Sequence, residues 1–203
     1  MNAHMNQGQP SPWVSRFAEL IPAGRVLDLA CGGGRHSRLL VGLGHTVLAV
    51  DRDLAALALA SGQGIVTLEF DLEHPEASRQ PDWPLTSERF NGIVVSNYLH
   101  RPLTAALFDS LAPGGILIYE TFAAGNGQFG KPSNPAFLLN PGELLEWARS
   151  QPVCHVIAFE DGYQHQPRPA MVQRICLRKA DGLAALPAEA VMLDHRTQPV
   201  APQ

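Results

Sequence analysis

A short apolar run followed by three consecutive glycines constrains the fold of this chain more than any other feature. Residues 25–29 read Arg-Val-Leu-Asp-Leu, which has the composition of a buried strand. The glycines at 32–34 allow a sharp backbone turn, and leucines then recur at helical spacing over 35–43. The stretch therefore predicts a strand, a turn and a helix whose free N–H groups can face a polar ligand.

Asp28 indicates which polar ligand such a turn would hold. Nicotinamide and flavin enzymes use a similar glycine turn and lay a pyrophosphate over it. A carboxylate at the end of the strand would repel that pyrophosphate, but it would attract a cation. S-adenosylmethionine carries an ammonium and a sulfonium, so Asp28 favours this ligand and leaves an oxidoreductase as the weaker alternative.

The motif Asp-Leu-Ala-Cys-Gly-Gly-Gly at 28–34 resembles the first motif of class I S-adenosylmethionine-dependent methyltransferases. Leu-Ala-Pro-Gly-Gly-Ile-Leu-Ile at 111–118 is similar to a turn and strand that are frequent in the same superfamily. Within it, the segments 31–37 and 44–51 resemble the tellurite-resistance (TehB-like) methyltransferases. The resemblance extends over roughly residues 25–180 with its motifs in the correct order, which is more specific than a glycine turn alone.

Composition and charge fit an ordinary globular protein of one domain. The 203 residues are 45% hydrophobic and 17% charged, and the net charge of −4 gives no general attraction to nucleic acid. The three cysteines form no CxxC pair and no metal-ligand pattern, so we expect a reducing compartment and no metal site. Because no apolar run reaches membrane-spanning length and no signal-peptide core begins the chain, we expect a cytoplasmic protein.

Alternating strand and helix patterns predict an α/β fold. We expect a Rossmann-like, seven-stranded, mostly parallel sheet with helices on both faces and an antiparallel edge strand. The methyltransferase domain should span 13–180, between a disordered N-terminus at 1–12 and a loose C-terminal tail at 181–203. Strands are expected at 26–29, 46–50, 64–70, 90–96, 116–119, 155–159 and 172–177, and helices at 13–21, 35–43, 55–60, 102–111 and 141–150.

Acidic residues that follow the second and third strands are candidates for cofactor binding. Asp51 stands 17 residues after Gly34 and can accept hydrogen bonds from both hydroxyls of a ribose. The alternative, a helix N-cap, is better served by Asp53. The resemblance implies that Asp71 and the N–H of Leu72 contact the adenine. The full set of cofactor-binding residues that we expect is Asp28, Ala30, Cys31, Gly32, Gly34, Asp51, Arg52, Asp71, Leu72 and Ser96.

The acceptor side is expected beyond the fourth and fifth strands. The sequence Ser-Asn-Tyr-Leu at 96–99 lacks the prolines of the Asn-Pro-Pro-Tyr motif, which argues against methylation of nucleobase or glutamine amino groups. An oxygen or nitrogen nucleophile would benefit from Tyr98, His100 or Glu120 as a catalytic group, although a single histidine is more often structural. We expect Phe129, in a lid-like loop at 123–140, to line the acceptor together with Tyr98 and His100.

The predicted function is in-line methyl transfer from S-adenosylmethionine to a small-molecule acceptor. A thiolate or chalcogen anion would need no strong base, whereas oxygen and nitrogen acceptors would. Two alternatives remain open at this point: an RNA or protein methyltransferase that works with a partner subunit, and a non-catalytic protein that binds S-adenosylmethionine. No partner other than the acceptor is expected, neither nucleic acid nor membrane, and the oligomeric state is not predicted.

Overall fold

The structure is a computed structural model that describes residues 8–80, 83–85 and 89–181. Most of the predicted disordered N-terminus and of the predicted loose tail lies outside these residues. Pro12, which we assigned to the N-terminal segment, is the first residue of helix α1 (Pro12–Phe17), and the Ser11 side chain caps that helix.

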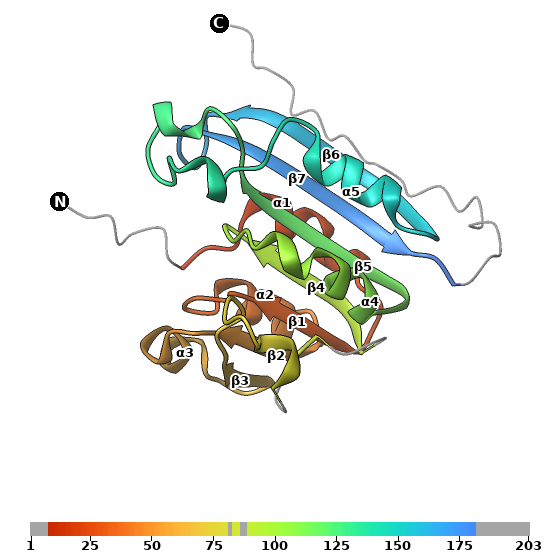
Figure 1. The fold of residues 1–203 in the computed structure, drawn as a ribbon. Helices are drawn as coiled ribbons and strands as arrows, with labels where there is room; N and C mark the ends of the chain where they lie inside the picture. The colour runs from red at the N-terminus through yellow and green to blue at the C-terminus, as the bar shows by residue number, and fades with distance from the viewer. Residues whose placement is uncertain (1–7, 81–82, 86–88, 182–203) are drawn as a thin grey trace, which may run out of the picture.

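Seven strands form one sheet in the order β3-β2-β1-β4-β5-β7-β6 (Figure 1). Strands β1 to β5 pair in parallel, and β7 pairs antiparallel with both β5 and β6. The predicted fold class is therefore confirmed, with the reversed strand one place inside the edge. The bounds are β1 (Arg25–Leu29), β2 (Thr46–Asp51), β3 (Ile65–Glu69), β4 (Phe90–Ser96), β5 (Leu111–Phe122), β6 (Cys154–Gln164) and β7 (Ala170–Lys179).

Helices cover both faces of the sheet (Figure 1). Buried residues of α1, α2 (Arg35–Gly42) and α3 (Leu54–Ala60) share one core cluster, and those of α4 (Thr104–Ser110) and α5 (Glu143–Ser150) share the other. All five helices lie where the sequence predicts them. Short 3-10 turns add Ala18–Leu20, Ala77–Arg79, Arg101–Leu103, Asn126–Gln128 and Pro135–Phe137.

The central strands are buried on both faces, as a parallel sheet requires. Val26 of β1 packs towards α1 and α2, and Leu27 packs towards α4 and α5. Because successive side chains of a strand point to opposite faces, the apolar run at 25–29 supplies both cores at once. β1 is thereby fixed in the middle of the sheet, with its carboxyl end and the glycine turn at one edge.

Three strands, β5, β6 and β7, are longer than predicted. β5 includes the Ala-Pro-Gly-Gly segment at 112–115, where the register with β4 shifts by a bulge. β6 continues through Tyr163 because each added residue has a cross-strand partner in β7. In β6, this pairing with β7 overrides the polar, turn-like composition of residues 160–164. At the carboxyl edge, β5 extends past the end of β4, where Ser96 pairs with Glu120.

Candidate functional site

The turn after β1 is shaped for close approach by a ligand. Ala30, Gly32 and Gly34 have positive φ angles of 53°, 51° and 74°. For Ala30 this conformation costs about 1–2 kcal/mol, which is characteristic of functional turns. A Cβ on Gly32 would meet open space, so nothing in the described protein occupies that side of the turn.

Gly34 has a different role from Gly32. A Cβ on Gly34 would lie 2.6 Å from the Cβ of Ala60 and 2.7 Å from its Cα. The Gly34 N–H donates to the carbonyl of Cys31 within the turn. Gly34 therefore lets α2 begin close against α3, and its predicted contact with the cofactor stays a prediction.

Asp51, at the end of β2, is held by two backbone donors. The N–H of Gly32 donates to Oδ2 at 2.8 Å, and the N–H of Asp53 donates to Oδ1 at 3.0 Å. A carboxylate has about four acceptor positions, so each oxygen keeps one for a ligand. The side chain of Asp53 caps α3, as expected for the alternative role that we considered for Asp51. The geometry leaves Asp51 fixed and able to accept two hydroxyl hydrogen bonds.

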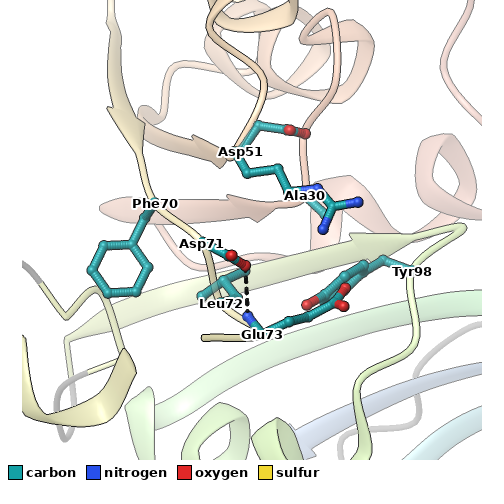
Figure 2. A pocket seen from close by; sticks show the side chains of 8 residues that line it. Ala30, Asp51, Phe70, Asp71, Leu72, Glu73 and Tyr98 are labelled. Carbon is teal, nitrogen blue, oxygen red and sulfur yellow. Dashed lines mark hydrogen bonds between the residues drawn. The ribbon is translucent and has the colours of Figure 1, made fainter. Parts of the chain in front are cut away.

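A cavity of about 190 Å³ opens beside Asp51 (Figure 2). It brings together six of the residues that the sequence predicts for the site, from four separate segments. Since ligand pockets usually measure about 300–1,000 Å³, this cavity matches only part of a nucleoside cofactor. The lining residues are Ala30, Asp51, Arg52, Phe70, Asp71, Leu72, Glu73 and Tyr98.

The segment after β3 forms one wall of the cavity (Figure 2). Asp71 Oδ1 accepts from the N–H of Glu73 at 3.0 Å, which fixes the loop, and Leu72 is buried. Behind them, the ring of Phe70 packs edge-on against Trp83, with centroids 5.8 Å apart. No hydrogen bond within the described residues uses Asp71 Oδ2, so this oxygen can accept a hydrogen bond from a ligand amino group.

Tyr98 lines this cavity together with the predicted cofactor residues, and its predicted role on the acceptor side stays a prediction (Figure 2). Its hydroxyl is buried, and it makes no hydrogen bond of good geometry within the part of the chain that the structure describes. Burial, followed by the carboxylates of Glu73 and Asp71, raises the pKa of Tyr98 well above its ordinary value. The phenol therefore stays protonated and can donate to a ligand.

Asp28 lies beneath the turn and does not line the cavity. It is 1% exposed, and its Oδ2 accepts a 2.6 Å hydrogen bond from the hydroxyl of Ser37 in α2. Burial raises the pKa of Asp28 to about 6, against the smaller opposing effects of Ser37 and Arg35. Asp28 thus ties β1 to the first turn of α2, and its predicted contact with the cofactor stays a prediction.

A row of polar side chains runs from the carboxyl end of β4 across the neighbouring residues of β5 and β7. Arg35 Nη2 donates to the hydroxyl of Ser96 at 3.1 Å, and that hydroxyl donates to Glu120 Oε1 at 3.1 Å. Glu120 Oε2 in turn lies 3.3 Å from Nε of Arg174. Because both oxygens of Glu120 are engaged, this carboxylate is poorly placed to remove a proton from an acceptor.

His100 begins the 3-10 turn after β4 and is half-buried. Its imidazole makes no hydrogen bond or ion pair with any residue of the described ranges. The neighbouring Arg101 anchors the loop at 123–140 through the carbonyls of Ala136 and Leu138 and through a bidentate pair with Glu143. The loop is thus tied down beside His100.

Phe129 projects from the same loop but does not line the cavity beside Asp51. It is 42% exposed and packs against Tyr163 of β6, with ring centroids 5.1 Å apart. This contact places Phe129 against β6, the edge strand of the sheet, and its predicted place on the acceptor side stays a prediction.

Sequence reasoning missed several residues of the site. Because Arg35 directly follows the glycines, the sequence indicates that it lies at the start of α2. The sequence does not indicate that its side chain contacts Ser96. Glu73 stands two residues after Asp71, which could have indicated a second carboxylate in the cavity. Arg174 had no local signal, since only the pairing of β7 with β5 sets it opposite Glu120.

Residues 1–171 match the family model described as methyltransferase domain. The chain belongs to this family, and the predicted class of S-adenosylmethionine-dependent methyltransferases is confirmed, with S-adenosylmethionine as the cofactor. The residues on the page fit that cofactor: Asp51 can accept from a ribose, the turn is open at Gly32, and Tyr98 has an unused hydroxyl.

The individual relatives cover the chain only in part. A protein-L-isoaspartate O-methyltransferase from Chlorobaculum tepidum is 30% identical over 116 residues, which are 57% of this chain and 53% of that protein. A ubiquinone biosynthesis O-methyltransferase from Paraburkholderia phytofirmans is 30% identical over 120 residues, 54% of this chain and 48% of that protein. The chain thus spans about half the length of these relatives.

Among solved structures, TehB from Haemophilus influenzae has a TM-score of 0.64 at 20% identity, and the match covers 82% of this chain and 61% of that one. The resemblance to the tellurite-resistance group therefore extends to the fold. In the described ranges we find no cluster of three or more side chains suited to a metal ion. The helices within them are also too short or too polar to cross a membrane.

Proposed function

We propose that this protein transfers the methyl group of S-adenosylmethionine to a small-molecule acceptor. The observation that carries the proposal is the carboxylate of Asp51, which two backbone N–H groups fix beside an open glycine turn. Such a carboxylate recognises the two hydroxyls of a ribose without rearrangement. Because it is already oriented, little conformational entropy is lost when the cofactor binds.

The remaining cavity residues contact different parts of the nucleoside. Asp71 Oδ2 accepts from the adenine amino group, and the N–H of Leu72 donates to a ring nitrogen. The hydroxyl of Tyr98 donates to the same nucleoside, because its buried position and raised pKa keep it protonated. Ala30 and Gly32 present backbone to the ligand at the turn.

S-adenosylmethionine supplies an activated methyl group, because the sulfonium is a good leaving group. In the transfer, a lone pair of the acceptor forms the new bond to the methyl carbon while the carbon–sulfur bond breaks. The chain aligns the two partners and excludes water. An acceptor that loses a proton delivers it to solvent or to His100, since Glu120 is paired with Arg174 and Tyr98 is already protonated.

A small acceptor is favoured by the form of the acceptor side. The loop at 123–140 is held by Arg101 and by Asn126, whose amide donates to the carbonyl of Pro132 at 2.9 Å. With a net charge of −4 the chain offers no general attraction to RNA. A fixed wall beside His100 suits a compact acceptor better than a long polymer.

Calorimetric titration with S-adenosylhomocysteine tests the donor site. Asp51→Ala removes two hydrogen bonds to a charged acceptor, so we expect the affinity to fall about 100-fold or more. Asp53→Ala is the matched control: it removes the cap of α3 and about 1 kcal/mol of stability, but it should bind the ligand normally. Unchanged affinity in Asp51→Ala would remove Asp51 from the site.

A labelled-methyl transfer screen over thiols, tellurite, small amines, RNA and protein tests the acceptor class. We expect turnover by the purified chain with a small molecule. Methylation of RNA or protein alone would overturn this part of the proposal. Tight binding of the donor without transfer to any acceptor would instead support the non-catalytic alternative.

A further inference from the structure

The cavity beside Asp51 accounts for the nucleoside of the cofactor but leaves its amino-acid end without a site. That end carries an α-carboxylate and an α-ammonium. From a ribose on Asp51, the rest of the cofactor must run over the glycine turn to the neighbouring carboxyl ends of β1 and β4, which pair side by side (Figure 1). Any residue that recognises the carboxylate therefore has to stand at this place.

We propose that Arg35 binds the α-carboxylate of the methyl donor. Arg35 is the first residue of α2 and directly follows the glycine turn. Its guanidinium spans from the turn to the end of β4, where Nη2 meets the hydroxyl of Ser96 at 3.1 Å. This inference rests on the proposed function, since it assigns the part of the donor that the cavity does not hold.

Arg35 has hydrogen-bonding capacity left for a ligand. A guanidinium has five N–H donors in a rigid fork that matches a carboxylate. Within the described residues, the Arg35 side chain makes one hydrogen bond, to the hydroxyl of Ser96. The free side of the fork can therefore receive a carboxylate while Ser96 holds the other side in place.

The nearby acids do not neutralise Arg35. Glu120 Oε2 pairs with Nε of Arg174, and its Oε1 accepts from Ser96 rather than from Arg35. Asp28 lies buried beneath the turn, where it accepts from Ser37. Among the described residues, no carboxylate makes an ion pair with Arg35, and the charge of Arg35 acts on Asp28 only through space. The half-buried setting of Arg35 strengthens its interaction with an anion.

A second cation needs to be distinguished from Arg35. Arg52 is exposed and lines the cavity next to Asp51. It stands on the nucleoside side, after β2, whereas Arg35 stands on the side of β4. If Arg52 took the carboxylate, the cofactor would have to fold back over its own ribose.

The test compares two ligands that differ in the amino-acid end. S-adenosylhomocysteine carries the carboxylate, and 5′-methylthioadenosine lacks the entire amino-acid chain. Calorimetric titration of both ligands is carried out with the wild-type protein and with Arg35→Met, which keeps the length of the side chain but loses the fork. We expect Arg35→Met to bind S-adenosylhomocysteine at least about tenfold more weakly and 5′-methylthioadenosine with unchanged affinity.

Arg35→Lys provides a second variant that keeps the charge. It should lose part of the affinity for S-adenosylhomocysteine, because an ammonium cannot match a carboxylate through two parallel bonds. Arg149→Met, an exposed arginine of α5 on the opposite face of the sheet, is the control and should bind both ligands normally. The unchanged affinity for 5′-methylthioadenosine also shows that each variant is folded.

Four results would overturn the inference. Equal weakening of both ligands in Arg35→Met would make the residue structural. No weakening of either would remove it from the site. A loss specific to S-adenosylhomocysteine in Arg52→Met, and not in Arg35→Met, would assign the carboxylate to Arg52. A wild-type protein that binds neither ligand would contradict the proposed function itself, and the inference with it.

Discussion

The carboxyl group of Asp28 is buried among aliphatic side chains. The free energy of unfolding therefore depends on whether this group is protonated, and so on pH. The side chain is 1% exposed and has a single side-chain donor, the hydroxyl of Ser37. Burial raises its pKa to about 6 from the ordinary 3.8. The folded state thus holds a proton on Asp28 at pH values where the unfolded chain has released it.

Replacing Asp28 with Asn should change the pH dependence of stability. In the wild type, the raised pKa stabilises the fold at low pH, and this contribution is lost as the pH rises through 6. Between pH 5 and 8 we expect the wild type to lose about 1.4 kcal/mol relative to Asp28→Asn, whose amide oxygen can still accept from Ser37. Urea unfolding at both pH values measures the difference. Parallel pH profiles would mean that Asp28 keeps an ordinary pKa in the folded protein.

At the scale of elements, the turn between β1 and α2 contains two glycines with different surroundings. Gly32 has open space where its Cβ would be, and Gly34 has the backbone of α3. Both have positive φ angles, so alanine is strained at either position. What distinguishes them is whether an added methyl group meets protein or ligand.

Two alanine variants should therefore fail in different ways. Gly34→Ala should lose about 2–5 kcal/mol of stability, because steric overlap with Ala60 adds to the backbone strain. Gly32→Ala should lose only about 1–2 kcal/mol but should bind S-adenosylhomocysteine more weakly, since its methyl group occupies ligand space. Chemical denaturation and calorimetric titration of both variants measure the two effects. Equal stabilities would refute the assignment of Gly34 to packing.

The elements that sequence could predict are those with a strong local pattern. The apolar runs at 25–29 and 90–96 located two central strands to within a residue, because burial on both faces leaves no room for polar side chains. β5, β6 and β7 extend further than predicted. The residues that extend β6, at 160–164, are mostly polar or glycine, and pairing with β7 holds them in the sheet.

The same distinction applies to the candidate site. Asp51 and Asp71 were predicted because each directly follows a strand, and strand ends in such a sheet meet at one edge. The row from Arg35 to Arg174 could not be predicted, because it depends on which strands become neighbours. Tyr98 was expected on the acceptor side, and only the backbone path after β4 brings it into the cavity beside Asp51.

At the scale of the whole molecule, His36 joins the N-terminal helix to the site. Its Nε2 accepts a 3.1 Å hydrogen bond from the N–H of Ser11, the residue that caps α1. Burial, with a smaller contribution from Arg35, lowers the pKa of His36 to about 3. The link exists only with a neutral imidazole, because a protonated one has no lone pair to offer.

Acid should therefore weaken the attachment of α1. The lowered pKa of His36 stabilises the fold above pH 6.5. This contribution is lost as the pH falls, because the unfolded chain binds a proton that the folded protein does not bind. From pH 7.5 to 5 we expect a loss of about 2 kcal/mol relative to His36→Gln, whose amide oxygen can also accept from Ser11. Denaturant unfolding of both proteins measures it. Identical losses would show that His36 titrates freely in the folded state.

The order of the strands also governs how the chain folds while it is being synthesised. β6 leaves the ribosome before β7, yet its hydrogen bonds to the sheet run only through β7 within the described structure. A nascent chain that ends before residue 170 therefore exposes the open edge of β5, with the backbone groups of Leu117 and Tyr119 unpaired. Such an intermediate is a natural substrate for chaperones, and the last strand to emerge ends that exposure for both neighbours at once.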